Sequence, residues 1–459
     1  MLFLALLAAA PFQFHVDNAE FPNAVFHLSC LSDRVPCTKP QVEKFWHGDL
    51  QWTNIDQHQL DAWNAALDGV SGRQVKPPES PFLPNYGDFY PGPAAVRRII
   101  AAGLDSHSPA EFRKHAATFA SPNEIAQLSA ALAHFERRLR PWWHSKGAPY
   151  AAARQRPIET LMNAPGVSVL GDRIARFMES EITSRKFRIH LIPRSDPKSD
   201  GAIATVVGNH VLAEVIDAMR PDEALPYMMH ELTHALYDLA PLRLHQQLIR
   251  DFVASSEPNS QPLYALLNEG IATAVQITLM RQTMPDQDIY RDPFIPRIGR
   301  AVAGPLARAL ENGPTLYHGF LGSYLRASAA ELKEELASPR FILSTAMPVS
   351  IGKLDEAEKA CQSYLVTHWA GDFAERNRFS EVNLMVLITY DRLDAISDNW
   401  SEIIPLSQAH RGFAFSAPRN TKGHWYVLAG RDDTTVAEVV QRLAAIRTGT
   451  GDGVVLTID

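Results

Sequence analysis

The feature that most constrains the fold and chemistry of this chain is residues 227–236, which read YMMHELTHAL. This segment contains His230, Glu231 and His234 in the pattern HExxH. On a helix, positions four apart share one face, so both imidazoles can reach the same metal ion while Glu231 stands beside them. The pattern predicts a helix that carries two zinc ligands and a glutamate able to accept a proton.

The residues around the motif separate this interpretation from a chance occurrence of the same letters. Met228, Met229, Leu232, Ala235 and Leu236 are apolar, so the helix is expected to be buried. Three ionisable side chains on a buried helix need partners, and a metal ion supplies one. The alternative, a coincidental motif, is therefore the weaker interpretation.

A second apolar segment, residues 266–274, carries one carboxylate downstream of the motif. Catalytic zinc usually keeps three protein ligands and leaves one position for water, and Glu269 fits the vacant place. Its neighbours Gly270, Ala272, Thr273 and Ala274 are small, which would let this helix approach the HExxH helix closely. The alternative for Glu269 is a solvated helix acid.

With these two motifs, residues 185–330 resemble the gluzincin group of zinc metallopeptidases, in which an HExxH helix is followed by a helix with a glutamate ligand, often in an Asn-Glu pair. The resemblance implies a zincin-like catalytic unit that binds Zn²⁺ through His230, His234 and Glu269. It also implies that Glu231 is the general base in the hydrolysis of a peptide or protein substrate.

Some positions depart from related patterns. Metzincins require Gly and His where this chain has Tyr237 and Ala240, so that variant is excluded. Many gluzincins place Asp four residues after the glutamate ligand, where this chain has Thr273. Asp238, one helical turn after His234, is the candidate for orienting that ligand; the alternative is that it pairs with Arg243 or faces water.

Residues 187–192 alternate as a strand does, residues 204–212 are expected to form a second strand, and both precede the motif. The resemblance implies that such a sheet edge binds extended peptide by strand addition. His190 and His210 lie in these strands, and we expect them to be packed or solvated and not to bind metal.

In the expected mechanism, zinc activates a water molecule, and Glu231 removes a proton from it. The resulting hydroxide attacks a peptide carbonyl, and Glu231 then protonates the leaving amine. The resemblance implies a further oxyanion donor, a Tyr or His beyond the glutamate ligand. Tyr317, His318 and Tyr324 lie in that range. Ordinary core or surface aromatics are the alternative for each.

Composition agrees with a soluble globular enzyme of two or three domains. The 459 residues are 46% hydrophobic and 21% charged, enough to bury more than one core. A net charge of −7 without a basic run argues against nucleic acid or an anionic membrane surface as partner. The sequence has no apolar segment long enough to form a transmembrane helix.

The N-terminal residues 1–10 are apolar and end in alanines before Pro11, which is typical of a secretory signal, although a basic n-region is lacking. A buried strand or helix is the alternative. Cys30 and Cys37 are close enough in the sequence for a disulfide to close a small loop, which would suit an oxidising compartment. The alternative is that both are reduced, buried thiols. We expect the protein to be periplasmic or secreted.

The sequence predicts an α+β protein with four regions. These are a signal segment at 1–10, a helix-rich region at 11–160, a zincin-like catalytic domain with a small sheet at 161–335, and an α/β domain at 336–459. Ser121 and Glu124 predict a capping box in the second region. Strands at 386–389, 412–415 and 425–428 and an apolar helix stripe at 436–446 mark the last region.

The predicted function is zinc-dependent peptide hydrolysis. The alternatives are a non-catalytic, zinc-containing exported protein that binds peptides or cell-wall material, and a metal-dependent hydrolase of non-peptide amides. Glu231 favours catalysis, because a structural zinc site needs no general base and usually closes its fourth position with a protein ligand.

Overall fold

The fold is taken from a computed structural model. It describes residues 12–71, 92–180, 186–198, 203–218, 220–257, 259–280, 294–336, 341, 343, 345–365, 384–397, 401–419, 423–446 and 453–459. The expected signal segment at 1–10 lies outside these residues.

The chain divides into two units. One comprises residues 1–245, 275–287 and 307–317, and the other comprises residues 246–274, 288–306 and 318–459. Because the boundaries fall inside α10 (Leu242–Ala254), α12 (Leu267–Met280) and α13 (Ile295–Asn312), these helices contribute residues to both units.

The remaining helices fall into an N-terminal and a C-terminal set. The N-terminal set is α1 (Glu20–Leu31), α2 (Lys39–Lys44), α3 (Asn54–Ser71), α4 (Gly92–Leu104), α5 (Pro109–Ala116), α6 (Pro122–Trp142), α7 (Ala148–Met162), α8 (Pro165–Phe177) and α9 (Pro221–Asp238). The C-terminal set is α11 (Ser260–Ala265), α14 (Leu321–Glu331), α16 (Asp355–Ala360), α17 (Asp394–Ser397), α18 (Ile403–Ala409) and α19 (Asp433–Ala445).

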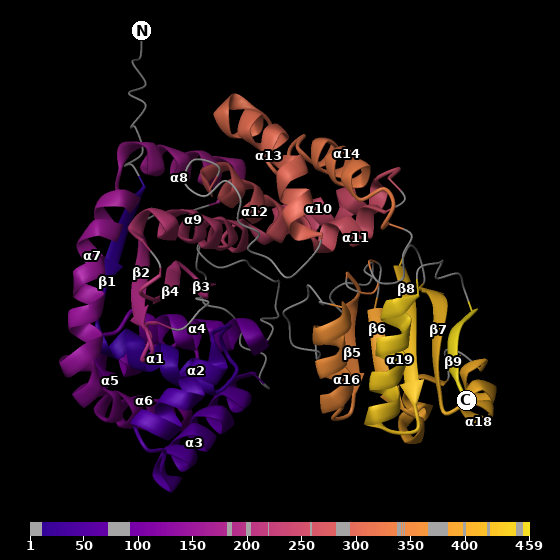
Figure 1. Ribbon diagram of the computed structural model, residues 1–459, viewed down its shortest axis with the longest axis horizontal. Coiled ribbons are helices and arrows are strands. Elements are labelled where there is room, and N and C mark those ends of the chain that lie inside the picture. The colour runs from indigo at the N-terminus through magenta and orange to yellow at the C-terminus, as the bar shows by residue number, and fades with distance from the viewer. Residues whose placement is uncertain are drawn as a thin grey trace. The chain divides into compact units, whose positions relative to one another are not determined.

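The sheet of the first unit has four strands in the order β1-β2-β4-β3 (Figure 1). They are β1 (Gln13–Asp17), β2 (Lys186–Pro193), β3 (Ala204–Val207) and β4 (His210–Val215). β1, β2 and β4 are parallel, and β3 runs antiparallel along the β4 edge. The predicted strand β2 is confirmed. The single strand expected over residues 204–212 is instead two antiparallel strands, β3 and β4, because the chain turns at Gly208, whose φ is 61°; β1 was not predicted.

An apolar core joins α1 to α6 with one face of this sheet. Trp46, Trp63 and Phe135 are fully buried in it, and Ile192 of β2 and Leu212 of β4 belong to the same cluster. Since the helices alone could not cover all of their apolar faces, the sheet completes this core. On the sheet, α7 contacts β1 and β2, and α9 contacts β3 and β4.

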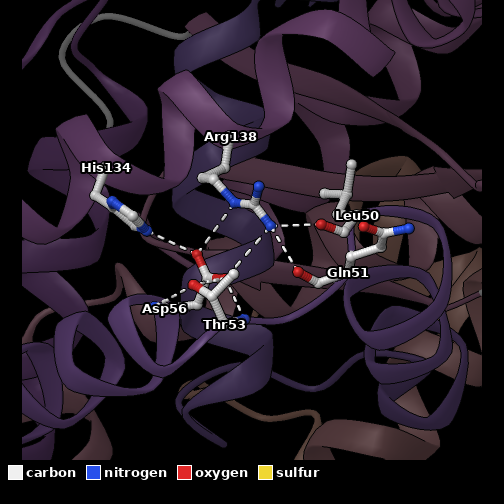
Figure 2. Close-up of polar contacts among 6 residues, drawn as sticks. All are labelled: Leu50, Gln51, Thr53, Asp56, His134 and Arg138. Atoms are coloured by element: carbon white, nitrogen blue, oxygen red, sulfur yellow. Dashed lines mark hydrogen bonds and ion pairs between the residues drawn. The ribbon is translucent and has the colours of Figure 1, made fainter.

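A buried carboxylate fixes α3 to α6. Figure 2 shows Asp56 in contact with Thr53, His134 and Arg138. One Asp56 oxygen lies 2.7 Å from His134 Nε2 and 3.2 Å from Arg138 Nε. Burial opposes ionisation of Asp56, but hydrogen bonds from His134 and Thr53 outweigh it and lower the pKa below its ordinary value.

The predicted capping box at the start of α6 is confirmed. The Ser121 backbone N–H donates to Glu124 Oε2 at 2.8 Å, and the Glu124 N–H donates to Ser121 Oγ at 3.4 Å. These bonds satisfy two backbone donors that have no partner within the helix.

Cys30 and Cys37 form a disulfide with their Cα atoms 5.9 Å apart, while Cys361 is a buried free thiol. The residue after the bridge, Thr38, donates through its backbone N–H and hydroxyl to Glu214 of β4, at 2.9 and 2.6 Å. The bridged loop is thereby tied to the sheet.

A second sheet, in the order β5-β6-β8-β7-β9, forms the end of the chain. Its strands are β5 (Met347–Ile351), β6 (Leu384–Thr389), β7 (Gly412–Arg419), β8 (Gly423–Gly430) and β9 (Gly453–Ile458). β5, β6 and β8 are parallel, and β7 is antiparallel to β8 and β9. The predicted strands β6, β7 and β8 and helix α19 are confirmed.

Both faces of this second sheet are covered. Leu387 packs with α16 and α19, which lie over one face in Figure 1, whereas the adjacent Val386 packs with Ile396 of α17 and Ile403 of α18. Neighbouring strand residues point to opposite faces, so the sheet lies between two apolar layers. This arrangement lies within residues 336–459, where the sequence predicted α and β elements.

The described residues are mostly helical with two small mixed sheets, which agrees with an α+β class. None of the described helices combines the length and the apolar character that crossing a bilayer requires.

Candidate metal centre

The HExxH motif lies on helix α9, as predicted. Pro221 occupies the first turn, and Glu223 Oε2 accepts the Arg220 backbone N–H at 3.0 Å, so the helix start is well satisfied. Met229, Leu232 and Leu236 are fully buried, and α9 packs against α7, α8, β3 and β4. This packing fixes the helix and therefore the direction of its polar face.

His230 and His234 turn their rings toward one another on that face. Their Nε2 atoms are 2.9 Å apart, and the ring planes are nearly perpendicular at 80°. His230 is buried at 7% exposure and His234 is half-buried. Two ring nitrogens that face each other at this distance are placed to share one cation.

Glu269, in the first turn of α12, completes a possible three-ligand group. One ligand atom from each of His230, His234 and Glu269 lies within 4.8 Å of the other two. Two imidazole nitrogens and one carboxylate oxygen are a donor set that suits zinc and leaves a coordination position open. The predicted metal ligands are therefore brought together, and their chemistry fits the ion.

Glu231 is half-buried and adjacent in sequence to the ligand His230. It lies on α9, the helix that carries the two histidines. A carboxylate in that place can take up and release a proton without being a ligand itself.

Gly270, one of the small residues beside Glu269, packs against another helix. A Cβ atom at Gly270 would lie 2.7 Å from Cγ2 of Ile298 in α13 and 3.7 Å from Tyr324 in α14. Gly270 therefore permits close packing of α12 on α13, a contact that was not predicted. The expectation that the small residues let α12 approach the HExxH helix stays a prediction.

Asp238 binds a residue that the sequence did not suggest. Its Oδ2 lies 3.6 Å from Nη1 of Arg97 in α4, and both side chains are about half exposed. Arg97 was not among the expected partners of Asp238, and the expectation that Asp238 orients His234 stays a prediction. Sequence spacing gave no signal for it, because α4 and α9 are far apart in the chain.

The three candidate oxyanion donors lie in different environments. Tyr324 is fully buried, and its hydroxyl donates to the Leu263 carbonyl at 2.8 Å. Tyr317 is buried with its ring edge against His245, at 5.6 Å between centroids, whereas His318 is exposed. The hydroxyl of Tyr324 therefore holds α14 to the end of α11, and we do not assign it a place in the mechanism.

Arg97 also contacts the edge of the first sheet. Its Nη2 donates to the Val206 carbonyl of β3 at 3.1 Å. β3 is the antiparallel edge strand, and it contacts both α4 and α9. The edge strand thus lies beside the helix that carries the motif, with one of its carbonyls held by a side chain that was not predicted.

No known protein family, curated protein or solved structure matches this chain.

Proposed function

We propose that this protein hydrolyses peptide bonds with zinc as its metal, as a gluzincin-like metallopeptidase. The observation that carries the proposal is the facing pair His230 and His234, with Nε2 atoms 2.9 Å apart and a Glu269 ligand atom within 4.8 Å. A structural site would usually fill the fourth position with another protein ligand. Among the described residues the group has three members.

His230, His234 and Glu269 would hold the metal. When bound, zinc acts as a Lewis acid on a carbonyl oxygen and lowers the pKa of a water toward neutrality. Glu231 would accept the proton of the attacking water and deliver it to the leaving nitrogen, so the carboxylate would be ionised again at the end of the cycle. Tyr317 and His318 are the candidate donors for the developing oxyanion.

The placement of β3 supports a peptide as substrate. An edge strand presents backbone N–H and C=O groups, and an extended peptide can pair with them. Because β3 contacts α9, a peptide added to this edge would run past the motif helix. Export to the periplasm or medium is part of the proposal, and the Cys30–Cys37 disulfide supports it.

Glu231→Gln tests the proposal, since the amide keeps the size of the side chain but cannot act as the base. We expect the variant to retain zinc and lose at least about 100-fold of the activity of wild type on a peptide library. Glu223→Gln, on the same helix, is the matched control, because glutamine can still accept the capping hydrogen bond.

Full peptide hydrolysis by Glu231→Gln would overturn the mechanism. A zinc-loaded wild type that cleaves no peptide would point to a binding protein, and cleavage of small non-peptide amides alone would point to an amidohydrolase.

A further inference from the structure

Two buried histidines outside the metal centre form a continuous polar chain. Nε2 of His190 in β2 lies 2.9 Å from Nδ1 of His210 in β4, and both side chains are fully buried. At one end, His190 Nδ1 lies 2.9 Å from Asp17 Oδ1, and at the other, His210 Nε2 lies 3.5 Å from Asp105 Oδ2. The chain therefore runs carboxylate, imidazole, imidazole, carboxylate.

This chain crosses the sheet under the N-terminal helices. His190 and His210 share a face of the sheet with Ile192 and Leu212, because alternate strand residues point the same way. Asp17 ends β1, and Asp105 follows the last residue of α4. Three strands and one helix are thus linked through two side chains that have no access to solvent.

The two neutral histidines have one N–H group too few for their three polar contacts. The three contacts along the chain need three N–H groups, but two neutral imidazoles carry only two. In either arrangement of tautomers that keeps the N–H···N bond between the rings, one ring nitrogen then presents a lone pair to a carboxylate. The distances identify that nitrogen as Nε2 of His210, which has the longer contact and no hydrogen-bond partner.

We propose that His190 and His210 form a buried site for a single proton, which is taken up in acid and then draws Asp105 and the end of α4 onto β4. One added proton completes all three hydrogen bonds, and it is shared because either ring can hold it while the N–H···N bond persists. A second proton would break that bond, since two imidazolium rings would place N–H against N–H.

The surrounding charges set the direction of the response. Burial lowers the pKa of His210, and its contact with Asp105 partly restores it. Arg188 Nη1 lies 3.5 Å from Asp105 Oδ1, and His115 of α5 also faces Asp105 electrostatically. His15 faces Asp17 at the other end.

Burial is the largest of these effects, and with the charges of His190 and Arg188 it lowers the pKa of His210 below its ordinary value of 6.5, so proton uptake is expected in acid. The unfolded chain binds this proton more tightly than the folded pair, so global stability falls over the same range. The response must therefore be followed at the two rings and not by unfolding alone.

The test is a pH titration of the histidine ring signals of the full chain by ¹H–¹³C NMR, with signals assigned by His190→Gln and His210→Gln. We expect both rings to shift together with a single common midpoint, because they share one proton. Asp105→Asn should weaken proton affinity about tenfold by removing the carboxylate partner. Asp49→Asn, an exposed position, is the matched control and should leave the midpoint unchanged.

Arg188→Gln gives a second and opposite readout, because removal of the cation beside Asp105 should raise the proton affinity of the pair. Independent titration of the two rings would overturn the proposal. So would an Asp105→Asn midpoint equal to that of Asp49→Asn, or a shift in the same direction for Asp105→Asn and Arg188→Gln.

Discussion

His230 Nε2 and His234 Nε2 lie 2.9 Å apart on one face of α9, so both ring nitrogens lie within reach of one small ion. Two zinc–nitrogen bonds of about 2.0–2.1 Å at a tetrahedral angle need nitrogens about 3.3 Å apart. The rings would have to separate by only a few tenths of an ångström. Most of the arrangement required for metal binding is therefore present in the packed helix.

Gly270→Ala tests how tightly α12 packs on α13. The new Cβ would lie 2.7 Å from Ile298 Cγ2, closer than real side chains approach. We expect a net loss of about 1–2 kcal/mol in the free energy of unfolding, because overpacking exceeds the gain in helix propensity. Adding Ile298→Leu, which lacks Cγ2, should recover part of it.

The control is Gly166→Ala in α8, where a Cβ meets nothing within 4 Å. Urea unfolding of the four proteins gives the comparison. Equal stability of Gly270→Ala and Gly166→Ala would show that α12 and α13 are not in close contact at this position.

His27 should make stability depend on pH in mild acid. Burial lowers its pKa to about 3 from 6.5, and its Nδ1 accepts the Trp46 indole N–H at 3.2 Å. The unfolded chain thus binds a proton between pH 6.5 and 3 that the folded chain does not. The contribution of neutral His27 to the free energy of unfolding is fully present above pH 6.5. It falls by about 1.4 kcal/mol for each pH unit below that value.

Urea unfolding between pH 7.5 and 4.5 measures this slope. His27→Gln keeps an acceptor for the Trp46 N–H but does not titrate. The slope of its free energy of unfolding against pH should therefore be smaller than that of wild type by the amount that one bound proton contributes. An identical slope in wild type and variant would show that His27 is already solvated in the fold.

The Cys30–Cys37 disulfide should contribute about 2–3 kcal/mol, the value for a short closed loop. Protein made in an oxidising compartment and then unfolded without reductant should present one reactive thiol, from Cys361, and three after reduction. Cys30→Ser with Cys37→Ser should unfold at lower urea concentration. Three thiols before reduction would argue against both the bridge and export.

The parts of the fold that were predicted depend on local patterns. The apolar flanks of His230 placed the motif on a buried helix, alternation placed β2, and Ser121 with Glu124 placed the start of α6. The turn at Gly208 that divides β3 from β4 was not predicted. β1 was also not predicted, although Gln13–Asp17 alternates between exposed and buried residues, because its partner β2 lies far away in the chain and pairs with it in parallel.

In the candidate site, too, the residues that could be predicted are those set by short sequence patterns. His230, Glu231 and His234 follow from one helical period, and Glu269 from a nearby apolar segment that carries one carboxylate. The Asp238–Arg97 pair depends on the packing of α4 near α9, which no spacing in the sequence encodes. A buried Tyr324 was the alternative to a role as oxyanion donor, but its hydrogen bond to the Leu263 carbonyl was not predicted, because α12 and α13 lie between the two residues in the chain.

The most direct test of the central claim is the zinc content of the purified, dialysed chain, measured by elemental mass spectrometry. Wild type and Glu311→Ala, which removes an exposed acid of α13, should each hold one zinc, and Glu269→Ala should lose most of it. A folded wild type that holds no zinc after loading with excess metal, or a Glu269→Ala variant that retains zinc as well as Glu311→Ala does, would contradict the three-ligand site.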